Sequence, residues 1–210
     1  MFTGIIHHLG SITSITHRNN SVVLVIAHSF ESLRIGESVS VDGVCLTVID
    51  ADSCHFTCEL SSETCRVTTA SRYILHQSVN VERAMQCNDR FGGHIVMGHV
   101  YGMCKISFIK KENDFVVFQF SDVTQEKRVF LVKKGCITIN GVSLTINEIN
   151  QQSSSDFSVM VIPHTLRNTN LSHCSLGDYV NVEYDYFAKL IVHYCESIFD
   201  TSCHSRFTTR

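Results

Sequence analysis

The 210-residue sequence contains one proline, no tryptophan and few charged residues. Charged side chains make up 18% of the chain, and 17 Lys and Arg against 20 Asp and Glu give a net charge of −3. A chain without an excess of basic residues lacks the positive surface that neutralises nucleic-acid phosphates or an anionic membrane. We therefore expect neither nucleic acid nor a membrane as a partner.

Long apolar runs and closely paired cysteines are also missing. No run reaches the roughly 18 residues that a membrane-spanning helix needs, and the opening MFTGIIHHLG carries no basic segment followed by an apolar one. None of the ten cysteines is spaced Cys-x-x-Cys, which argues against a zinc ribbon or a thioredoxin-type site. We expect a cytoplasmic protein whose cysteines are reduced and mostly buried as small apolar groups.

Signatures of metal or nucleotide binding are absent as well. His94 and His99 have an odd spacing, which on a strand directs their side chains to opposite faces, so they do not form a pair of metal ligands. Neither common form of glycine-rich phosphate loop occurs. We expect no bound metal and no cofactor.

What the sequence does contain is an internal repeat. Three segments of the first half return in the same order in the second half, namely 41–48 at 139–146, 63–68 at 164–169, and 79–82 at 180–183. Near the start, GII at 4–6 aligns with GHV at 98–100. So long a period indicates a duplicated domain and not a solenoid. We predict two similar domains, at 1–88 and 89–186.

Each half consists of short β-branched and apolar runs bounded by turn-forming residues. In the first half these runs are 22–27, 38–41, 46–49, 55–59 and 79–82. Six or so short strands in fewer than about 100 residues predict a small closed barrel, because closure removes exposed strand edges. The fold class we predict is therefore all-β, with two tandem barrels.

The end of the chain has a different pattern. From Tyr186 onward, apolar residues recur at helical spacing, at Phe187, Leu190, Ile191, Tyr194 and Ile198. This stripe predicts an amphipathic helix of about 14 residues within 187–210, followed by a frayed end. The stripe could cap a barrel of its own chain, or it could pack against copies of itself in an oligomer.

Matched positions of the two halves differ in chemistry. The informative pairs are Cys45 with Ser143, Ile5 with His99, and Ala84 with Asp185. The second half thus holds a hydroxyl, an imidazole and a carboxylate where the first half has a thiol and two apolar groups. Lys134 adds a cation there. Such a set is suited to acid–base chemistry.

Each of these residues also has a purely structural interpretation. Cys45 and Ser143 could be ordinary strand residues, His99 a hydrogen-bonded core histidine, and Asp185 the N-cap of the following helix. A hydrolase triad of Ser143, His99 and Asp185 is a further alternative. It lacks the Gly-x-Ser-x-Gly elbow that many such enzymes carry.

Several motifs together resemble the riboflavin synthase family, whose members have tandem lumazine-binding barrels. They are MFTGII at 1–6, GVCLTV at 43–48, GGHIVMGHV at 92–100, KG at 134–135, NGVSLT at 140–145 and IPHTL at 162–166. The likeness runs from residue 1 to about residue 196. It implies two six-stranded Greek-key barrels followed by a helix that assembles a homotrimer.

The resemblance also implies a reaction. Two molecules of 6,7-dimethyl-8-ribityllumazine exchange a four-carbon unit to give riboflavin and 5-amino-6-ribitylamino-uracil, without a metal or redox cofactor. One substrate is the donor and the other the acceptor, so two related pockets of different chemistry are what the reaction needs. In the family, these pockets face each other across a subunit interface. The resemblance further implies a partner, lumazine synthase.

Site residues follow from the resemblance in two groups. The first pocket is expected to contain Gly4, Ile5, Ile6, Ser38, Cys45, Leu46, Thr47, Glu59, Leu60, Ser61, Ser62, Glu63 and Thr64. The second is expected to contain Gly98, His99, Val100, Lys134, Ser143, Leu144, Thr145, Ile162, Pro163, His164, Thr165, Leu166 and Arg167. Asp185 would reach into the second pocket.

The resemblance also suggests roles for some of these residues. Ser143, His99 and Asp185, with Lys134 nearby, are expected to act in deprotonation and nucleophilic attack on one substrate. Cys45 is expected to lie by the ring of the other. Pro163 would fix the turn that presents backbone amides to the ligand.

The sequence departs from the family pattern in two places. His7 and His8 stand where acidic residues are common, and Tyr101 stands where Asp is common. The main alternative is an antenna-type lumazine protein, which keeps the fold and the pigment but not the catalytic groups. The joint presence of the thiol, hydroxyl, imidazole and carboxylate favours the enzyme. An oligomeric scaffold without a ligand would not require the halves to differ in this way.

Overall fold

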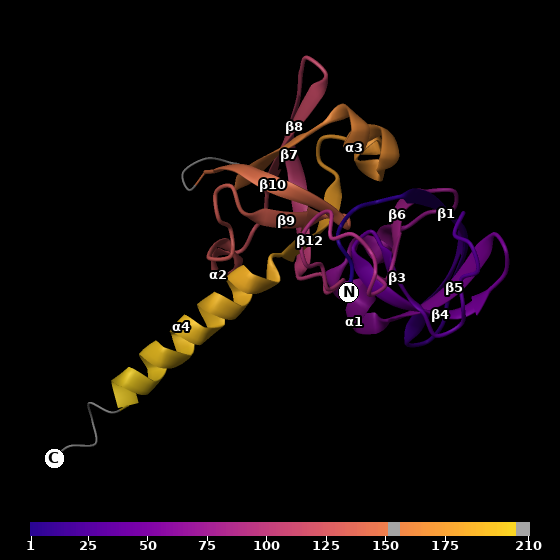
Figure 1. The fold of residues 1–210 in the computed structure, drawn as a ribbon, viewed down its shortest axis with the longest axis horizontal. Coiled ribbons are helices and arrows are strands. Elements are labelled where there is room, and N and C mark those ends of the chain that lie inside the picture. The colour runs from indigo at the N-terminus through magenta and orange to yellow at the C-terminus, as the bar shows by residue number, and fades with distance from the viewer. Residues whose placement is uncertain (151–155, 205–210) are drawn as a thin grey trace.

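The structure is a computed structural model that describes residues 1–150 and 156–204. It contains two closed barrels of six antiparallel strands each, followed by one long helix (Figure 1). The predicted fold class, all-β with two tandem six-stranded barrels and a C-terminal helix, is confirmed. Residues 205–210 of the predicted tail lie outside the described part of the chain.

The first barrel is formed by β1 (His8–His17), β2 (Ser21–Ala27), β3 (Ser38–Val41), β4 (Val44–Ala51), β5 (His55–Ser61) and β6 (Ser78–Arg83). Its strands are arranged in the order β1-β2-β5-β4-β3-β6. Hairpins join β3, β4 and β5, and β5 brings the chain back beside β2, so the order is that of a Greek key. Two short helices, α1 (Ser62–Val67) and η1 (Thr69–Arg72), connect β5 to β6.

The second barrel repeats this plan. Its strands are β7 (Gly102–Glu112), β8 (Phe115–Ser121), β9 (Cys136–Ile139), β10 (Val142–Ile149), β11 (Phe157–Val161) and β12 (Tyr179–Tyr184). Helix α2 (Gln125–Arg128) precedes β9, and α3 (Pro163–Asn168) with η2 (Asn170–His173) precedes β12. Pro163 occupies the first position of α3, where a missing N–H costs nothing.

Alternation along the strands separates the cores from the outward polar groups. In β4, Val44, Leu46 and Val48 are buried in the first barrel, while Cys45 and Thr47 point outward. In the second barrel, β10 repeats this pattern with the hydroxyl-bearing residues of its Val-Ser-Leu-Thr segment outside. The period of two therefore places the thiol and hydroxyl motifs on the outer surfaces of their barrels.

The barrels meet through a buried and nearly reciprocal polar network. Asn80 Nδ2 donates to the Asn140 carbonyl at 2.8 Å, and Asn181 Nδ2 donates to the Asp42 carbonyl at 2.9 Å. The Asp42 carboxylate also accepts hydrogen bonds from Tyr73 Oη at 3.0 Å and from the Asn80 amide at 2.7 Å. Matched residues of the repeat thus build the interface between the barrels.

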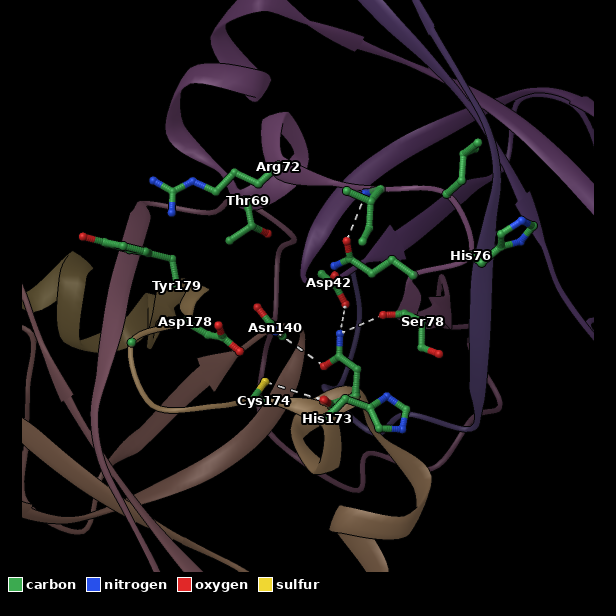
Figure 2. A pocket seen from close by; sticks show the side chains of 15 residues that line it. Asp42, Thr69, Arg72, His76, Ser78, Asn140, His173, Cys174, Asp178 and Tyr179 are labelled. Atoms are coloured by element: carbon green, nitrogen blue, oxygen red, sulfur yellow. Dashed lines mark hydrogen bonds between the residues drawn. The ribbon is translucent and has the colours of Figure 1, made fainter.

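A cavity of about 670 Å³ lies beside this network, between the two barrels. Figure 2 shows Asp42, Asn140 and Ser78 near the centre of the view, with His76 at the right and His173 below. None of the site residues predicted from the sequence lines this cavity. The predicted site residues therefore lie elsewhere on the barrels.

Two segments before the barrels cross each other. Phe2 and Val96 form an antiparallel bridge, in which each backbone amide donates to the other residue's carbonyl, at 2.7 and 3.1 Å. Ile6 then packs in the core of the second barrel, although it belongs to the first half of the sequence. Val100 of the second half packs against the core of the first barrel. The two barrels therefore exchange their entry segments, residues 2–6 and 96–100.

Helix α4 (Tyr186–His204) projects away from both barrels (Figure 1). Its apolar stripe is 44–65% exposed at Phe187, Leu190, Ile191, Tyr194 and Ile198. The helix is longer than the predicted one and does not cap a barrel of its own chain with this stripe. Among the described residues, no helix combines the length and hydropathy needed to span a membrane.

Candidate active site

The exchange of the entry segments corrects the expected grouping of the site residues. Gly4 was expected beside Cys45, but its carbonyl accepts a hydrogen bond from the Ser143 amide at 2.8 Å. Gly98 was expected beside Ser143, but its carbonyl accepts a hydrogen bond from the Cys45 amide at 2.9 Å. The segment 4–6 therefore lies against Ser143 of the second barrel, and the segment 98–100 lies against Cys45 of the first.

Glycine is required at both crossing points. A Cβ atom at Gly4 would lie 2.7 Å from the Cβ of Ser143, and one at Gly98 would lie 2.5 Å from the Cβ of Cys45. Both residues also have positive φ values, +74° and +77°, which favour glycine. The close approach brings the backbone of each exchanged segment directly against the thiol or the hydroxyl.

An imidazole contacts Ser143, but it comes from His94 and not from His99. His94 Nδ1 lies 2.7 Å from Ser143 Oγ, and His94 Nε2 lies 3.1 Å from the hydroxyl of Thr138 on the neighbouring strand β9. The ring is 7% exposed, so it is fixed between these two hydroxyls. Ser143 is half-buried and remains reachable from outside the barrel.

His94 reaches this place because it precedes the exchanged segment. Its backbone amide donates to the Thr3 carbonyl at 3.2 Å, next to the Phe2–Val96 bridge. Comparing the halves could not have selected this histidine, because the offset that aligns Gly98 with Gly4 would place its counterpart before Met1. Contact with Ser143 is visible only in the folded chain.

Burial lowers the pKa of His94, while the nearby Asp185 carboxylate opposes this effect. Asp185 also accepts a hydrogen bond from the Phe187 amide at 2.9 Å, in the first turn of α4. Asp185 therefore caps the start of α4, as expected, and also acts on His94 by its charge. The neutral form of His94 is the form that can accept a proton.

Among the described residues, neither His99 nor Lys134 forms a hydrogen bond with the His94–Ser143 pair. The His99 side chain is exposed, on the segment that packs against the first barrel beside Cys45. Lys134 is exposed at the turn before β9, where its backbone has a φ of +67°. Of the two histidines, His94 contacts Ser143, and the charge of Asp185 acts on His94.

Around Cys45, the first barrel presents a different set of groups. Cys45 is half-buried and lies opposite Ser40 in the β3–β4 pairing, while Thr47 lies opposite Ser38. Gly98 and the exposed His99 complete the surroundings of the thiol. The surroundings of Cys45 and Ser143 therefore share a backbone frame and differ in their side chains.

The segments 59–64 and 162–167 form the same local structure in both barrels. Ser61 caps α1 by accepting a hydrogen bond from the Thr64 amide at 3.1 Å, and Ile162 occupies the matching position before α3. The Glu59 carboxylate is held by Ser21 and Arg18 of the neighbouring strand region. The two segments place Thr64 and Thr165 at equivalent helix positions.

Some predicted site residues have their side chains in the barrel cores. These residues are Ile6, Leu46, Leu60 and Leu144. Only their backbone atoms can face a ligand on the outer surface. Val100 and Leu166 also pack against the cores as partly buried residues.

One group of metal-ligating side chains comes together within the described residues, although the cysteine spacing gave no sign of it. Asp52, Cys54 and His55 lie in the exposed turn between β4 and β5, with their ligand atoms within 4.8 Å of one another. Asp52 Oδ1 already accepts the amides of Cys54 and His55, both at 2.7 Å. These hydrogen bonds cap the turn, and they account for the short distances between the three side chains.

Comparison with known proteins agrees with the duplicated fold. The sequence model of the lumazine binding domain matches this chain twice, at residues 3–84 and 97–185. Riboflavin synthase of Bacillus subtilis strain 168 is 38% identical over 192 residues, covering 90% of this chain and 87% of that protein. Riboflavin synthase of Actinobacillus pleuropneumoniae is 37% identical over 193 residues, covering 91% and 88%.

Solved structures share the architecture. LumP complexed with riboflavin has a TM-score of 0.78 at 23% identity, covering 88% of this chain and 99% of that one. LumP complexed with 6,7-dimethyl-8-(1'-D-ribityl) lumazine has a TM-score of 0.76 at 24% identity, covering 87% and 98%. These identities support likeness of fold alone. By its two lumazine-binding repeats and its close relatives, the chain belongs to the riboflavin synthase family.

Proposed function

We propose that this protein is an active riboflavin synthase, which converts two molecules of 6,7-dimethyl-8-ribityllumazine into riboflavin and 5-amino-6-ribitylamino-uracil. Family membership makes it an enzyme, a transferase of riboflavin synthesis. The observation that supports catalysis most directly is the 2.7 Å contact between His94 Nδ1 and Ser143 Oγ. A protein that only held a pigment would have no need of a hydroxyl paired with a buried imidazole.

Within the second barrel, His94 acts as the acid–base group in this proposal. Its Nε2–H donates to Thr138 Oγ1, which leaves Nδ1 free to accept the Ser143 proton. Ser143 Oγ then serves as the nucleophile, or positions a water, at one lumazine ring. Asp185 stabilises the protonated imidazole by its charge. The same imidazole returns the proton when the four-carbon unit has been transferred.

The first barrel holds the second substrate in this proposal. Cys45, Ser38 and Thr47 face outward there, next to Gly98 and His99. Because donor and acceptor react differently, a thiol pocket and a hydroxyl pocket on one frame suit the reaction. The main contribution of the protein is to hold the two rings in a reactive orientation. The backbone amides of 59–64 and 162–167 would contact the pyrimidinedione edges.

We further propose that the chain works as a homotrimer, with sites between the first barrel of one subunit and the second barrel of the next. The exposed apolar stripe of α4 supports self-association. The proposed units are 1–88, 89–186 and 187–210, with the entry segments exchanged between the two barrels. A cytoplasmic location and a partnership with lumazine synthase complete the proposal.

The test is incubation of the purified protein with 6,7-dimethyl-8-ribityllumazine alone, in the presence of a chelator and without nicotinamide or flavin. We expect one riboflavin for every two lumazines consumed, together with one 5-amino-6-ribitylamino-uracil, measured by chromatography with absorbance detection. The Ser143→Ala variant is the matched control. Failure of the wild-type protein to form riboflavin would contradict the proposal.

An antenna protein is the second candidate, because the structural neighbours are LumP complexes with lumazine, riboflavin or flavin mononucleotide. This candidate predicts tight binding of the lumazine and a change in its fluorescence, with no loss of substrate over time. The same incubation therefore separates the two functions.

A further inference from the structure

Two buried glutamates hold the exchanged segments, and neither was singled out by the sequence. Glu82 on β6 and Glu183 on β12 occupy matched positions in the repeated Val-Asn-Val-Glu segment. They are only 4% and 3% exposed. In the described part of the chain, neither glutamate forms a salt bridge with a Lys or Arg side chain. Their burial is offset mainly by hydrogen bonds from backbone amides.

Both carboxylates accept hydrogen bonds from two successive backbone amides. Glu82 Oε1 accepts the Thr3 amide at 2.7 Å, and Oε2 accepts the Gly4 amide at 3.0 Å. Glu183 Oε1 accepts the Met97 amide at 2.7 Å, and Oε2 accepts the Gly98 amide at 3.0 Å. A carboxylate supplies two acceptor oxygens for such a pair of donors, whereas a carboxamide supplies only one.

Each of the two glycines is consequently held by both barrels. The Gly4 amide is bound by Glu82 of the first barrel, while its carbonyl accepts the Ser143 amide of the second barrel. The Gly98 amide is bound by Glu183 of the second barrel, while its carbonyl accepts the Cys45 amide of the first. A strand of one barrel thereby fixes the wall of the pocket on the other.

We propose that Glu82 and Glu183 are positioning residues, and that each acts on the barrel to which it does not belong. Through Gly4, Glu82 positions the backbone beside Ser143, and through Gly98, Glu183 positions the backbone beside Cys45. We call this arrangement the crosswise placement. An effect of the two glutamates on catalysis rests on the proposed function, whereas the crosswise placement does not. The two glutamates couple the pockets to the interface between the barrels.

Charge-assisted hydrogen bonds make this anchor stronger than a neutral one. A buried carboxylate that loses one of its donors is left with an oxygen that is neither hydrated nor paired, which is costly. The two glutamates therefore hold the backbone of residues 3–4 and 97–98 in place. Thr3 adds a third hydrogen bond to Glu82 through its hydroxyl at 2.9 Å, whereas Met97 has no hydroxyl to offer Glu183.

The crosswise placement is tested without measuring turnover, by hydrogen–deuterium exchange of single backbone amides in the full-length protein. In Glu82→Gln, we expect exchange of the Ser143 amide to accelerate about tenfold or more, with little change at Cys45. In Glu183→Gln, we expect the reverse. Equal acceleration at both amides in both variants, or no acceleration, would overturn the proposal.

A matched control is Glu37→Gln, because Glu37 binds Arg83, the neighbour of Glu82, and does not touch either exchanged segment. It should leave both amides unchanged. If Glu82→Gln fails to fold, Thr3→Val gives a milder test, since it keeps the Thr3 backbone hydrogen bond to Glu82 and removes only the hydroxyl, which donates to Glu82 and accepts the Ile5 amide at 3.3 Å. Thr3→Val must then raise exchange at Ser143 and leave Cys45 unaffected, and a uniform response would count against the proposal.

Turnover provides the second readout. A positioning role predicts that Glu82→Gln and Glu183→Gln lower kcat by about tenfold or more, with smaller changes in KM and in the thermal unfolding midpoint. A merely structural role would lower the unfolding midpoint without a selective loss of kcat in the folded fraction. If the wild-type protein forms no riboflavin, the proposed function fails, while amide exchange still decides the crosswise placement.

Discussion

His94 Nδ1 lies 2.7 Å from Ser143 Oγ, although the two residues are separated by almost fifty positions in the chain. The contact exists because His94 sits next to the bridge between Phe2 and Val96, where the exchanged segments cross. Ser143 is brought to the same place by the outward alternation of β10. The pair therefore depends both on local strand structure and on the crossing of two distant segments.

The first prediction concerns this pair. Ser143→Ala and His94→Gln should each lower kcat by about 10²- to 10⁴-fold, because both remove the same proton transfer. The double variant should be little worse than the poorer single variant. Steady-state kinetics with 6,7-dimethyl-8-ribityllumazine measure these effects. His99→Gln serves for comparison, because its decrease in kcat should add to the decrease caused by Ser143→Ala. If the decreases for Ser143→Ala and His94→Gln were additive as well, the two residues would act separately.

The second prediction concerns pH. Burial lowers the pKa of His94 and Asp185 raises it, so the neutral base is lost as pH falls through a value below 6.5. The acidic limb of kcat/KM should therefore have its midpoint below 6.5. Asp185→Asn removes the opposing charge and keeps a good N-cap for α4, so the limb should move to lower pH. A limb that moves upward or stays in place would contradict this assignment.

The third prediction uses the buried carboxylate between the barrels. Burial raises the pKa of Asp42 to about 7, against 3.8 for the ordinary side chain. The folded protein thus retains a proton that the unfolded chain releases, so the free energy of unfolding falls as pH rises from about 4 to about 7. Asp42→Asn, which copies Asn140 of the second half, should abolish this loss.

At pH 8, Asp42→Asn should be more stable than the wild-type protein by up to about 4 kcal/mol, an advantage that disappears near pH 4. Urea unfolding at the two pH values measures the difference. Asp50→Asn, at an exposed position on β4, is the control and should change stability by no more than about 0.5 kcal/mol. A pH-independent effect of Asp42→Asn would refute the prediction.

The fourth prediction tests which glycine lies beside which reactive group. Gly98→Ala places its Cβ against Cys45, whereas Gly4→Ala places it against Ser143. Alkylation of Cys45, followed by peptide mass spectrometry, should change in rate in Gly98→Ala and not in Gly4→Ala. Gly36→Ala is the control, because Gly36 also has a positive φ, +87°, but nothing within 4 Å. The opposite pattern would restore the grouping expected from the sequence.

The fifth prediction concerns α4. A chain that ends at Tyr186 should be monomeric and have little activity, because the proposed site spans two subunits. Ile191→Lys, in the middle of the exposed stripe, should weaken assembly without removing the helix, and Glu196→Lys should not. Sedimentation velocity and turnover measured on the same samples provide the check. A fully active monomer would contradict a site between subunits.

Much of the fold is predictable because its signals are local. The period of two in segments such as 44–51 and 142–149 separates inward from outward residues whatever the rest of the chain does. Strand β1 was not among the predicted runs, because only Gly10 and Ile12 of its ten residues are buried, so its alternation is weak. The stripe predicts the helix but underestimates its length, because the apolar repeat ends at Ile198 while the helix continues to His204.

The candidate site was predictable only in part. Comparing the halves selected Cys45 and Ser143, which do occupy equivalent outward positions, since duplicated domains keep equivalent residues in equivalent places. His94, Glu82 and Glu183 escaped the same comparison for different reasons. His94 has no counterpart in the first half, and the glutamates are identical in both halves, so neither creates a difference to notice.

The sequence by itself determined the two barrels, the helix and the outward placement of the thiol and the hydroxyl, because each depends on short-range alternation or on the repeat. The tertiary structure alone decided that residues 2–6 serve the second barrel and 96–100 the first. An exchange of matched segments preserves almost every local contact, so both arrangements are compatible with the same repeat. Only the crossing at Phe2 and Val96 distinguishes them, and it also brings His94 to Ser143.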